Sequence, residues 1–165
     1  MSSTQNPFKL LARALVLRLR GRARFERDIA DAEITIEGER FVAFRKVVVD
    51  PASDQPSESG AIFQVRFRFK NLSTKANQWL SLIPIPLITA QPGFRSKTWL
   101  LGEQTGGFVG YYEFDTVEQA EAYWDSLPLR MMRGRAAAGS LSYEVRPTDL
   151  PAAEVQGRAG VGWNS

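Results

Sequence analysis

The sequence predicts an α+β domain of the ferredoxin-like βαββαβ type for residues 61–146. Three observations carry this prediction. The segment 61–70 alternates between apolar and polar side chains, as a half-buried strand does. Three more strand-like segments follow, and each of the two crossovers contains a helix-like stretch with a capping residue at its start. This order places both helices on one face of an antiparallel sheet and leaves the other face open to water, a partner or a ligand.

The first half of this domain contains a strand, a broken helix and a second strand. The four strands are expected at 61–70, 94–101, 108–114 and 140–146, with turns at 91–93 and 102–107. Helix-capping chemistry at 71–74 begins a helical stretch that runs towards Ala90. Pro84 and Pro86 must break or kink that stretch, because proline lacks the backbone donor that a helix interior needs.

The second half contains a hairpin, a helix and the last strand. Asp115 followed by Glu118 has the spacing of a helix-capping box, so a helix is expected to start there. A short irregular or helical piece covers 128–138. Trp79 and Trp124 lie on the helical stretches, and we expect both to pack in the core.

Residues 31–60 are predicted to form a β-hairpin and a linker. Glu37-Gly38-Glu39 is a turn signal between segments rich in β-branched and aromatic residues. Residues 50–60 are rich in Pro, Ser and Asp, which is typical of a linker. At the other end of the chain, 147–165 is expected to be a loose tail.

Residues 1–30 are expected to form a basic amphipathic segment. Between Lys9 and Arg27 there are seven basic residues and a single acid, Glu26. We expect a helix to about Leu19, although 16–24 also alternates as a strand would. Such a segment, taken over residues 8–27, either packs on its own domain with a solvated arginine face, which we favour, or docks on an anionic membrane surface or a protein partner.

Charge and hydropathy also bear on where the chain acts. The apolar run near the N-terminus is too short and too often interrupted by charge to cross a membrane, and no signal peptide is expected. We therefore expect a cytoplasmic protein, with a peripheral membrane association as the alternative. Nucleic-acid binding is not expected, because the basic residues lack interleaved aromatics and an acidic run follows them at once.

The 165-residue chain contains neither histidine nor cysteine, which excludes several kinds of site. It cannot build a typical zinc site, a Ser-His-Asp triad, or haem ligation by histidine or a thiolate. Any acid–base step must use Asp, Glu, Lys or Tyr, or a group of the substrate.

The open face of the sheet is the predicted site. Its expected residues combine cations, aromatic rings and a carboxylate: Gln64, Arg66 and Lys97 for substrate binding, and Trp99, Tyr111 and Glu113 for catalysis. The cations would attract an oxyanion, the rings would stack on a flat substrate, and Tyr111 or Glu113 would move protons. The alternative is a solvated face with Arg–Glu pairs.

Part of the domain resembles the YdhR-like mono-oxygenase family. The shared features are Pro92-Gly93-Phe94 at the entry of the second strand, Lys97 and Trp99 within it, Gly106-Gly107 before the third strand, and a short helix after Asp115. This resemblance covers residues 61–146 and implies a homodimeric α/β barrel of the antibiotic-biosynthesis mono-oxygenase superfamily, in which two open sheet faces meet. No catalytic motif of the family carries over residue by residue.

The resemblance implies an enzyme that oxidises a flat aromatic or polyketide-like substrate with molecular oxygen and without a metal or flavin cofactor. We expect a homodimer with a small-molecule pocket and no bound cofactor. Two alternatives remain open. One is a non-enzymatic accessory subunit that docks through its basic N-terminal segment, and the other is an isomerase or cyclase with Glu113 as base.

Overall fold

A computed structural model of the chain describes residues 5–26, 29, 32–52, 60–70 and 73–148. The helices are α1 (Pro7–Leu19), α2 (Thr74–Leu80), α3 (Ile85–Thr89), α4 (Val117–Tyr123) and α5 (Leu127–Arg133). The strands are β1 (Ala23–Glu26), β2 (Glu33–Ile36), β3 (Glu39–Val49), β4 (Ala61–Phe67), β5 (Phe94–Gly102), β6 (Phe108–Phe114) and β7 (Ser142–Pro147). Most of the predicted linker, at 53–59, and of the predicted tail, at 149–165, lies outside the described residues.

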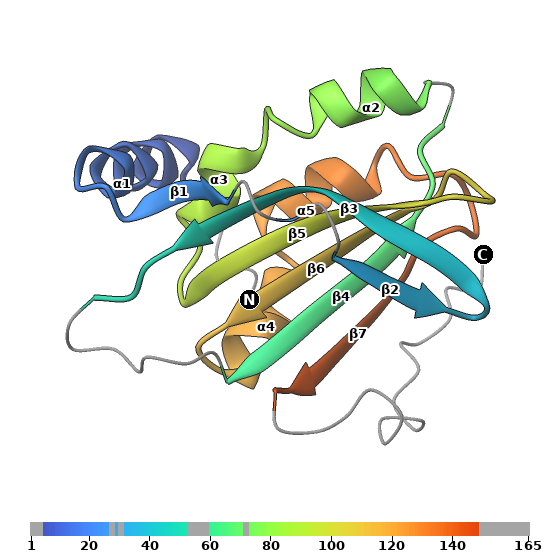
Figure 1. Cartoon of the computed structure of the whole chain (residues 1–165). Coiled ribbons are helices and arrows are strands. Elements are labelled where there is room, and N and C mark those ends of the chain that lie inside the picture. The colour runs from blue at the N-terminus through green and yellow to red at the C-terminus, as the bar shows by residue number, and fades with distance from the viewer. Residues whose placement is uncertain (1–4, 27–28, 30–31, 53–59, 71–72, 149–165) are drawn as a thin grey trace.

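The strands form one antiparallel sheet in the order β1-β3-β5-β6-β4-β7, with β2 also paired to β3. Within it, β5-β6-β4-β7 is the strand order that a βαββαβ chain produces, so the predicted ferredoxin-like arrangement is confirmed. The hairpin strand β3 pairs with β5 along most of its length. The N-terminal part of the chain therefore extends the same sheet, as Figure 1 shows.

One face of the sheet carries the main hydrophobic core. In β4 the inward residues are every second side chain, and Phe63 and Val65 are fully buried there. The helices supply the opposing side chains, which are Leu17, Ile85, Ile88, Ala120, Tyr123 and Leu129. Burial of each large apolar side chain stabilises the fold by roughly 1.5–3 kcal/mol. This covered face agrees with the parity predicted for β4 and for the last strand, whose Tyr143 and Val145 pack on the same core.

Prolines and caps set the helix bounds. The predicted first helical stretch is two short helices, because Pro84 and Pro86 fall where α2 has ended and α3 begins. The N-cap of α4 is Thr116, whose hydroxyl accepts from the Gln119 amide at 3.3 Å. The helix therefore starts after Thr116 and not at Asp115. The Asp115 carboxylate is instead paired with the buried Arg95 guanidinium.

The two tryptophans on the helices differ in their surroundings. Trp124 packs as predicted, with its ring stacked on Tyr143 at a centroid distance of 3.9 Å. Trp79 does not: its side chain is 75% exposed on α2. The helix α2 has seven residues, and only Asn77 is buried in it. The prediction for Trp79 was wrong because α2 turns Asn77, and not Trp79, towards the rest of the domain.

Candidate functional site

The open face brings together four of the six predicted site residues. Gln64 and Arg66 lie on β4, and Tyr111 and Glu113 lie on β6, with Gln64 directly opposite Tyr111 in register. Burial raises the pKa of the Tyr111 phenol, and the neighbouring Glu113 charge adds to this rise against the opposing effect of Arg146. Glu113 accepts a hydrogen bond from the Ser96 hydroxyl.

The β2–β3 hairpin curls over one end of this open face. Ile34 and Ile36 of the hairpin pack against a small apolar cluster that includes Phe41 and Tyr111. The turn at Glu37 and Gly38 has φ values of 51° and 81°, which suit the twisted two-residue turn of a hairpin. This end of the face is therefore filled by the chain itself.

Two carboxylates of the hairpin also form ion pairs with Arg66. The Arg66 guanidinium donates to Glu37 Oε2 at 2.6 Å and to Glu39 Oε2 at 3.4 Å. Its Cζ lies 5.4 Å from the centroid of the Phe41 ring. The structure thus gives Arg66 two carboxylate partners of its own chain, where the sequence predicted an oxyanion of the substrate. These ion pairs correspond to the alternative prediction for the open face, in which its arginines pair with glutamates of the same chain.

Glu39 is the buried end of this ion-pair network, and its side chain is 6% exposed. Its carboxylate accepts from the Thr105 amide and hydroxyl at 2.8 Å each, and from the Gln104 amide at 3.2 Å. Burial by itself would raise the pKa of Glu39. The hydrogen bonds from Thr105 and Gln104 and the charge of Arg66 outweigh burial, so the pKa is lowered.

Lys97 and Trp99 lie on the opposite, helix-covered face, so the face predicted for them was wrong. Lys97 is in register with Tyr112, and Trp99 with Gly110, and both Tyr112 and Trp99 belong to the main core. A register shift between Phe94 and Ser96 lets Phe94, Lys97 and Trp99 share the covered face. On β5 the open face instead receives Ser96, Thr98 and Leu100.

These two residues belong to what we call the Lys97 cluster, which comprises Arg45, Lys97, Trp99, Tyr112 and Tyr123. The Lys97 Nζ lies 4.2 Å from the Trp99 ring centroid and 4.5 Å from the Tyr112 ring centroid. Arg45 Cζ lies 5.8 Å from the same Trp99 ring. Two basic side chains therefore flank one indole.

The electrostatics of the Lys97 cluster are unusual. Lys97 is only 6% exposed, and within the described residues no carboxylate pairs with its ammonium group. Burial lowers the pKa of Lys97 well below its usual value, and the positive charge of Arg45 lowers it further. Burial also lowers the pKa of Arg45, whose guanidinium donates to the carbonyl oxygen of Gln78 in α2 at 3.1 Å and to the hydroxyl of Ser81, the C-cap of α2.

Sequence reasoning missed two phenols and one arginine of this cluster. Tyr112 and Tyr123 are 2% exposed, their ring centroids are 4.8 Å apart, and their side chains are hydrogen-bonded to each other. Burial raises the pKa of both phenols. The alternation of β6, in which Phe108, Tyr112 and Phe114 share one parity, could have identified Tyr112 as inward. No local signal placed Arg45 beside Trp99, because that contact depends on the pairing of β3 with β5.

A polar cleft of about 470 Å³ opens at the other end of the open face. Glu113 and Ser96 line it together with Arg95, which pairs with Asp115, and with the Glu26–Lys46 ion pair, whose atoms are 2.7 Å apart. The charges in this cleft are largely matched. It is nonetheless the place where a predicted catalytic residue, Glu113, borders open space.

Neither a metal cluster nor a membrane span is found in the part of the chain that the structure describes. No three Asp or Glu side chains gather there in a way that could hold an ion. No helix there is long and apolar enough to cross a bilayer.

Comparison with solved structures finds two similar folds. A heme-degrading enzyme from Listeria monocytogenes superposes with a TM-score of 0.51 at 9% identity, over 67% of this chain and 72% of that one. An anthrone oxidase-like protein gives a TM-score of 0.48 at 16% identity, over 69% of this chain and 59% of that one. The sequence matches no protein-family model. No curated protein matches it either.

The first of these similarities bears on the fold alone, because so low an identity says nothing about chemistry. It agrees with the predicted α+β, ferredoxin-like arrangement. The closer assignment to the YdhR-like family, the dimer and the closed barrel stay predictions.

Proposed function

We propose that this protein is an oxygenase-type enzyme that acts on a flat, acidic aromatic substrate, such as a phenol or a polyketide-like ring system, at the Lys97 cluster. The observation that carries this proposal is the buried Lys97 amine, which lies between two aromatic rings with no carboxylate partner among the described residues. Ionisable groups with strongly shifted pKa values gather at functional sites. A heme-degrading enzyme has a similar fold, and we extend small-molecule chemistry to this chain as part of the proposal.

The chemistry follows from the lowered pKa of Lys97. Because its pKa is lowered, the Lys97 amine is more often in its neutral, basic form than an ordinary lysine, and it accepts a proton from a phenol or from an acidic ring carbon of the substrate. The resulting ammonium group, together with Arg45, then stabilises the substrate anion. The Trp99 and Tyr112 rings supply flat surfaces for an aromatic substrate.

The proposed reaction needs molecular oxygen as its only co-substrate. The electron-rich substrate anion reduces oxygen directly. One oxygen atom enters the ring as a carbonyl oxygen, and the substrate loses two hydrogens, which are both hydrogens of the CH2 group in an anthrone, or one ring hydrogen and the hydroxyl proton in a phenol. The other oxygen atom leaves with these two hydrogens as water, so no external reductant is required. Because Lys97, Trp99 and Tyr112 are almost completely buried here, a substrate enters only when a covering element moves. The short helix α2, which contacts this cluster through Arg45, is the element we assign to that movement.

Oxygen consumption with anthrone and quinol substrates tests the proposal. We expect Lys97→Met to reduce turnover at least about a hundredfold, in line with the usual contribution of a positioned base. Glu113→Gln is the matched control on the other face, and it should leave turnover nearly unchanged. Oxygen consumption that survives in Lys97→Met and disappears in Glu113→Gln would assign the chemistry to the open face. Absence of oxygen consumption by the wild type with the whole panel contradicts the proposal.

The polar cleft supports a second candidate, an isomerase or cyclase in which Glu113 is the base. The cleft places the Glu113 carboxylate and the Ser96 hydroxyl beside open space on the same face as Tyr111. Product formation from the same substrates under anaerobic conditions distinguishes this reaction from an oxygenation. We expect no anaerobic product if the Lys97 cluster is the active site.

A further inference from the structure

The helix α1 divides into sectors around its circumference. Consecutive residues of an α-helix are rotated by about 100°. Leu10, Ala14 and Leu17 share one sector and are buried, where they pack with Ala90 and Leu87 or on the main core. This buried sector attaches α1 to the domain, as the favoured interpretation of the basic segment predicted. It uses less than half of the helix surface.

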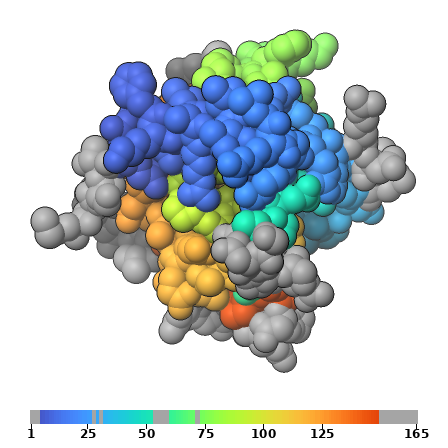
Figure 2. Space-filling view, turned by 90° about the vertical axis from the view of Figure 1, so that its left-hand side faces the viewer, coloured from blue at the N-terminus to red at the C-terminus, as the bar shows by residue number. Residues whose placement is uncertain are grey.

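A second sector of α1 is apolar and exposed. The exposed fractions are 79% for Phe8, 46% for Leu11, 58% for Leu15, 44% for Val16 and 77% for Leu19. Their spacing places them in one arc about 140° wide. We call this set the exposed arc. Large exposed apolar patches with a polar rim often mark sites of protein–protein or membrane interaction. Figure 2 shows α1 spread across the surface of this side of the molecule.

Basic side chains border the exposed arc on both sides. Around the helix axis, Arg18 lies next to Leu11 at one edge of the arc. Beyond Val16, at the other edge, lie Lys9, Arg20 and Arg13. The chain has no Asp or Glu before Glu26. The helical surface therefore presents an apolar strip between two cationic margins.

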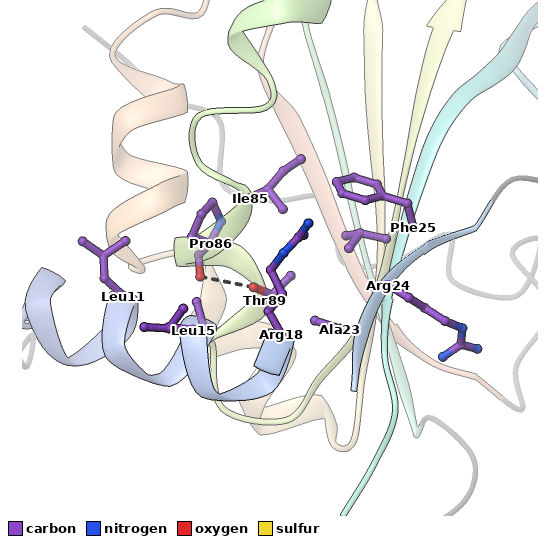
Figure 3. Close-up of a pocket in the computed structure, with 11 residues that line it drawn as sticks. Leu11, Leu15, Arg18, Ala23, Arg24, Phe25, Ile85, Pro86 and Thr89 are labelled. Carbon is purple, nitrogen blue, oxygen red and sulfur yellow. Dashed lines mark hydrogen bonds between the residues drawn. The ribbon is translucent and has the colours of Figure 1, made fainter. Parts of the chain in front are cut away.

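An apolar cavity of about 270 Å³ opens beside the exposed arc. Its walls come from four elements: Leu11 and Leu15 of α1, Ala23 and Phe25 of β1, Val47 of β3, and Ile85 and Pro86 of α3. In Figure 3 the Arg18 side chain extends between Ile85 and Phe25, whereas Arg24 points away from them. Arg24 pairs with Asp50, and within the described residues no carboxylate pairs with Arg18.

We infer that α1 docks on the surface of an anionic phospholipid bilayer. The exposed arc enters the boundary between headgroups and acyl chains, as the apolar face of an interfacial helix does. The basic margins on both sides then lie at the level of the phosphates, where each Lys or Arg adds attraction to an anionic leaflet. The cavity beside Arg18 accepts apolar lipid groups with an anionic headgroup at its mouth. This docking surface is separate from the Lys97 cluster and does not depend on the proposed reaction.

Vesicle flotation of the full chain tests this inference. Vesicles of phosphatidylcholine alone are compared with vesicles that also contain phosphatidylserine. We expect the wild type to bind the anionic vesicles at least about tenfold more strongly, and added salt to weaken that binding. Phe8→Ser with Leu19→Ser, and separately Lys9→Glu with Arg20→Glu, should each reduce binding about tenfold or more.

Two exposed positions on other helices serve as matched controls. Met131→Ser on α5 removes an exposed apolar side chain, and Lys75→Glu on α2 reverses an exposed charge, and both should bind like the wild type. Circular dichroism checks that every variant is folded. Equal binding to neutral and anionic vesicles, or no binding to either, overturns the inference. It is also overturned if sedimentation velocity shows a wild-type dimer that Phe8→Ser with Leu19→Ser converts into monomers, because a second copy then covers the arc.

Discussion

At the scale of single residues, Lys97 has the most unusual environment in the described chain. Its methylene stem packs on the covered face, and its amine lies against the rings of Trp99 and Tyr112. A buried ammonium group without a carboxylate is unfavourable, and contacts with aromatic faces offset only part of that cost. The consequence is a shift of the ionisation equilibrium towards the neutral amine.

This shift predicts a specific dependence of stability on pH. The pKa of Lys97 in the folded state lies below the value of about 10.4 expected for the unfolded chain. Between these two values the unfolded chain binds more protons, so the free energy of unfolding rises as the pH rises. In Lys97→Met this contribution is absent. The variant should be more stable than the wild type near neutral pH, and its advantage should shrink by up to ~1.4 kcal/mol for each pH unit across that window.

Urea unfolding of both proteins at several alkaline pH values measures this difference. Tyr112 and Tyr123 titrate in both proteins, so their effect largely cancels in the comparison. A difference in stability that does not change with pH would show that the Lys97 amine keeps its ordinary pKa.

At the scale of elements, the β2–β3 hairpin determines how much of the open face is free. Glu37 in its turn and Glu39, the first residue of β3, both form ion pairs with Arg66 on β4. These pairs form although β5 and β6 lie between β3 and β4 in the sheet. Gly102 leaves the space in which the Glu39 carboxylate lies, since a side chain there would overlap it. The buried Glu39 carboxylate therefore fixes the hairpin to the sheet, in addition to the apolar contacts.

Glu39→Gln should loosen this hairpin. The amide keeps the shape of the side chain but loses the charge that Arg66 and Thr105 stabilise, and we expect the free energy of unfolding to fall by about 1.5–3 kcal/mol at neutral pH. Because the pKa of Glu39 is lowered in the folded state, its contribution is complete above the unfolded-state value of about 4.3 and is lost as the pH falls through the folded-state value.

Chemical unfolding at neutral and acidic pH, with hydrogen exchange of the hairpin amides, measures the effect. Glu33→Gln is the matched control, because the Glu33–Arg40 pair is more than half exposed and should change stability by less than about 0.5 kcal/mol. If the two variants were equally stable, Glu39 would not be what holds the hairpin.

At the scale of the whole molecule, the helices that the structure describes all lie on one side of the sheet. The hairpin covers one end of the other face, and half-buried polar side chains such as Gln64, Thr98 and Tyr111 occupy its middle. We propose that two copies of the chain pair through this remaining surface, as the resemblance to the dimeric α/β barrels implies. Such an interface is isologous, so each residue occurs in it twice.

Thr98→Glu should therefore weaken the dimer. Thr98 lies opposite Tyr111 and Lys46 in register, near the middle of the open face. A carboxylate placed there would lose its hydration in the proposed interface, and we expect the dissociation constant to rise at least about tenfold. Sedimentation velocity over a range of concentrations measures this, with Lys75→Glu on the outer helix α2 as control. A wild type that stays monomeric at every concentration would contradict the proposed pairing.

Local side-chain order is enough to predict much of this fold. Alternation places Phe63 and Val65 of β4 on the covered face, and Pro84 and Pro86 predict the division between α2 and α3. The turn at Glu37-Gly38 and the helix that ends at Leu19 follow from equally local chemistry. In these segments the residues that determine the structure are neighbours in the chain, so periodicity, caps and turn residues carry the information.

The candidate site depends on contacts between distant segments, and only the tertiary structure decides those. A one-residue irregularity between Phe94 and Ser96 determines which face receives Lys97 and Trp99. The pairing of β3 with β5 brings Arg45 to Trp99, and the curl of the hairpin brings Glu39 to Arg66. Composition and parity identify Lys97, Trp99 and Arg66 as noteworthy residues. Their partners, and therefore their chemistry, follow from strand register and long-range packing, which leave no periodic signal in the sequence.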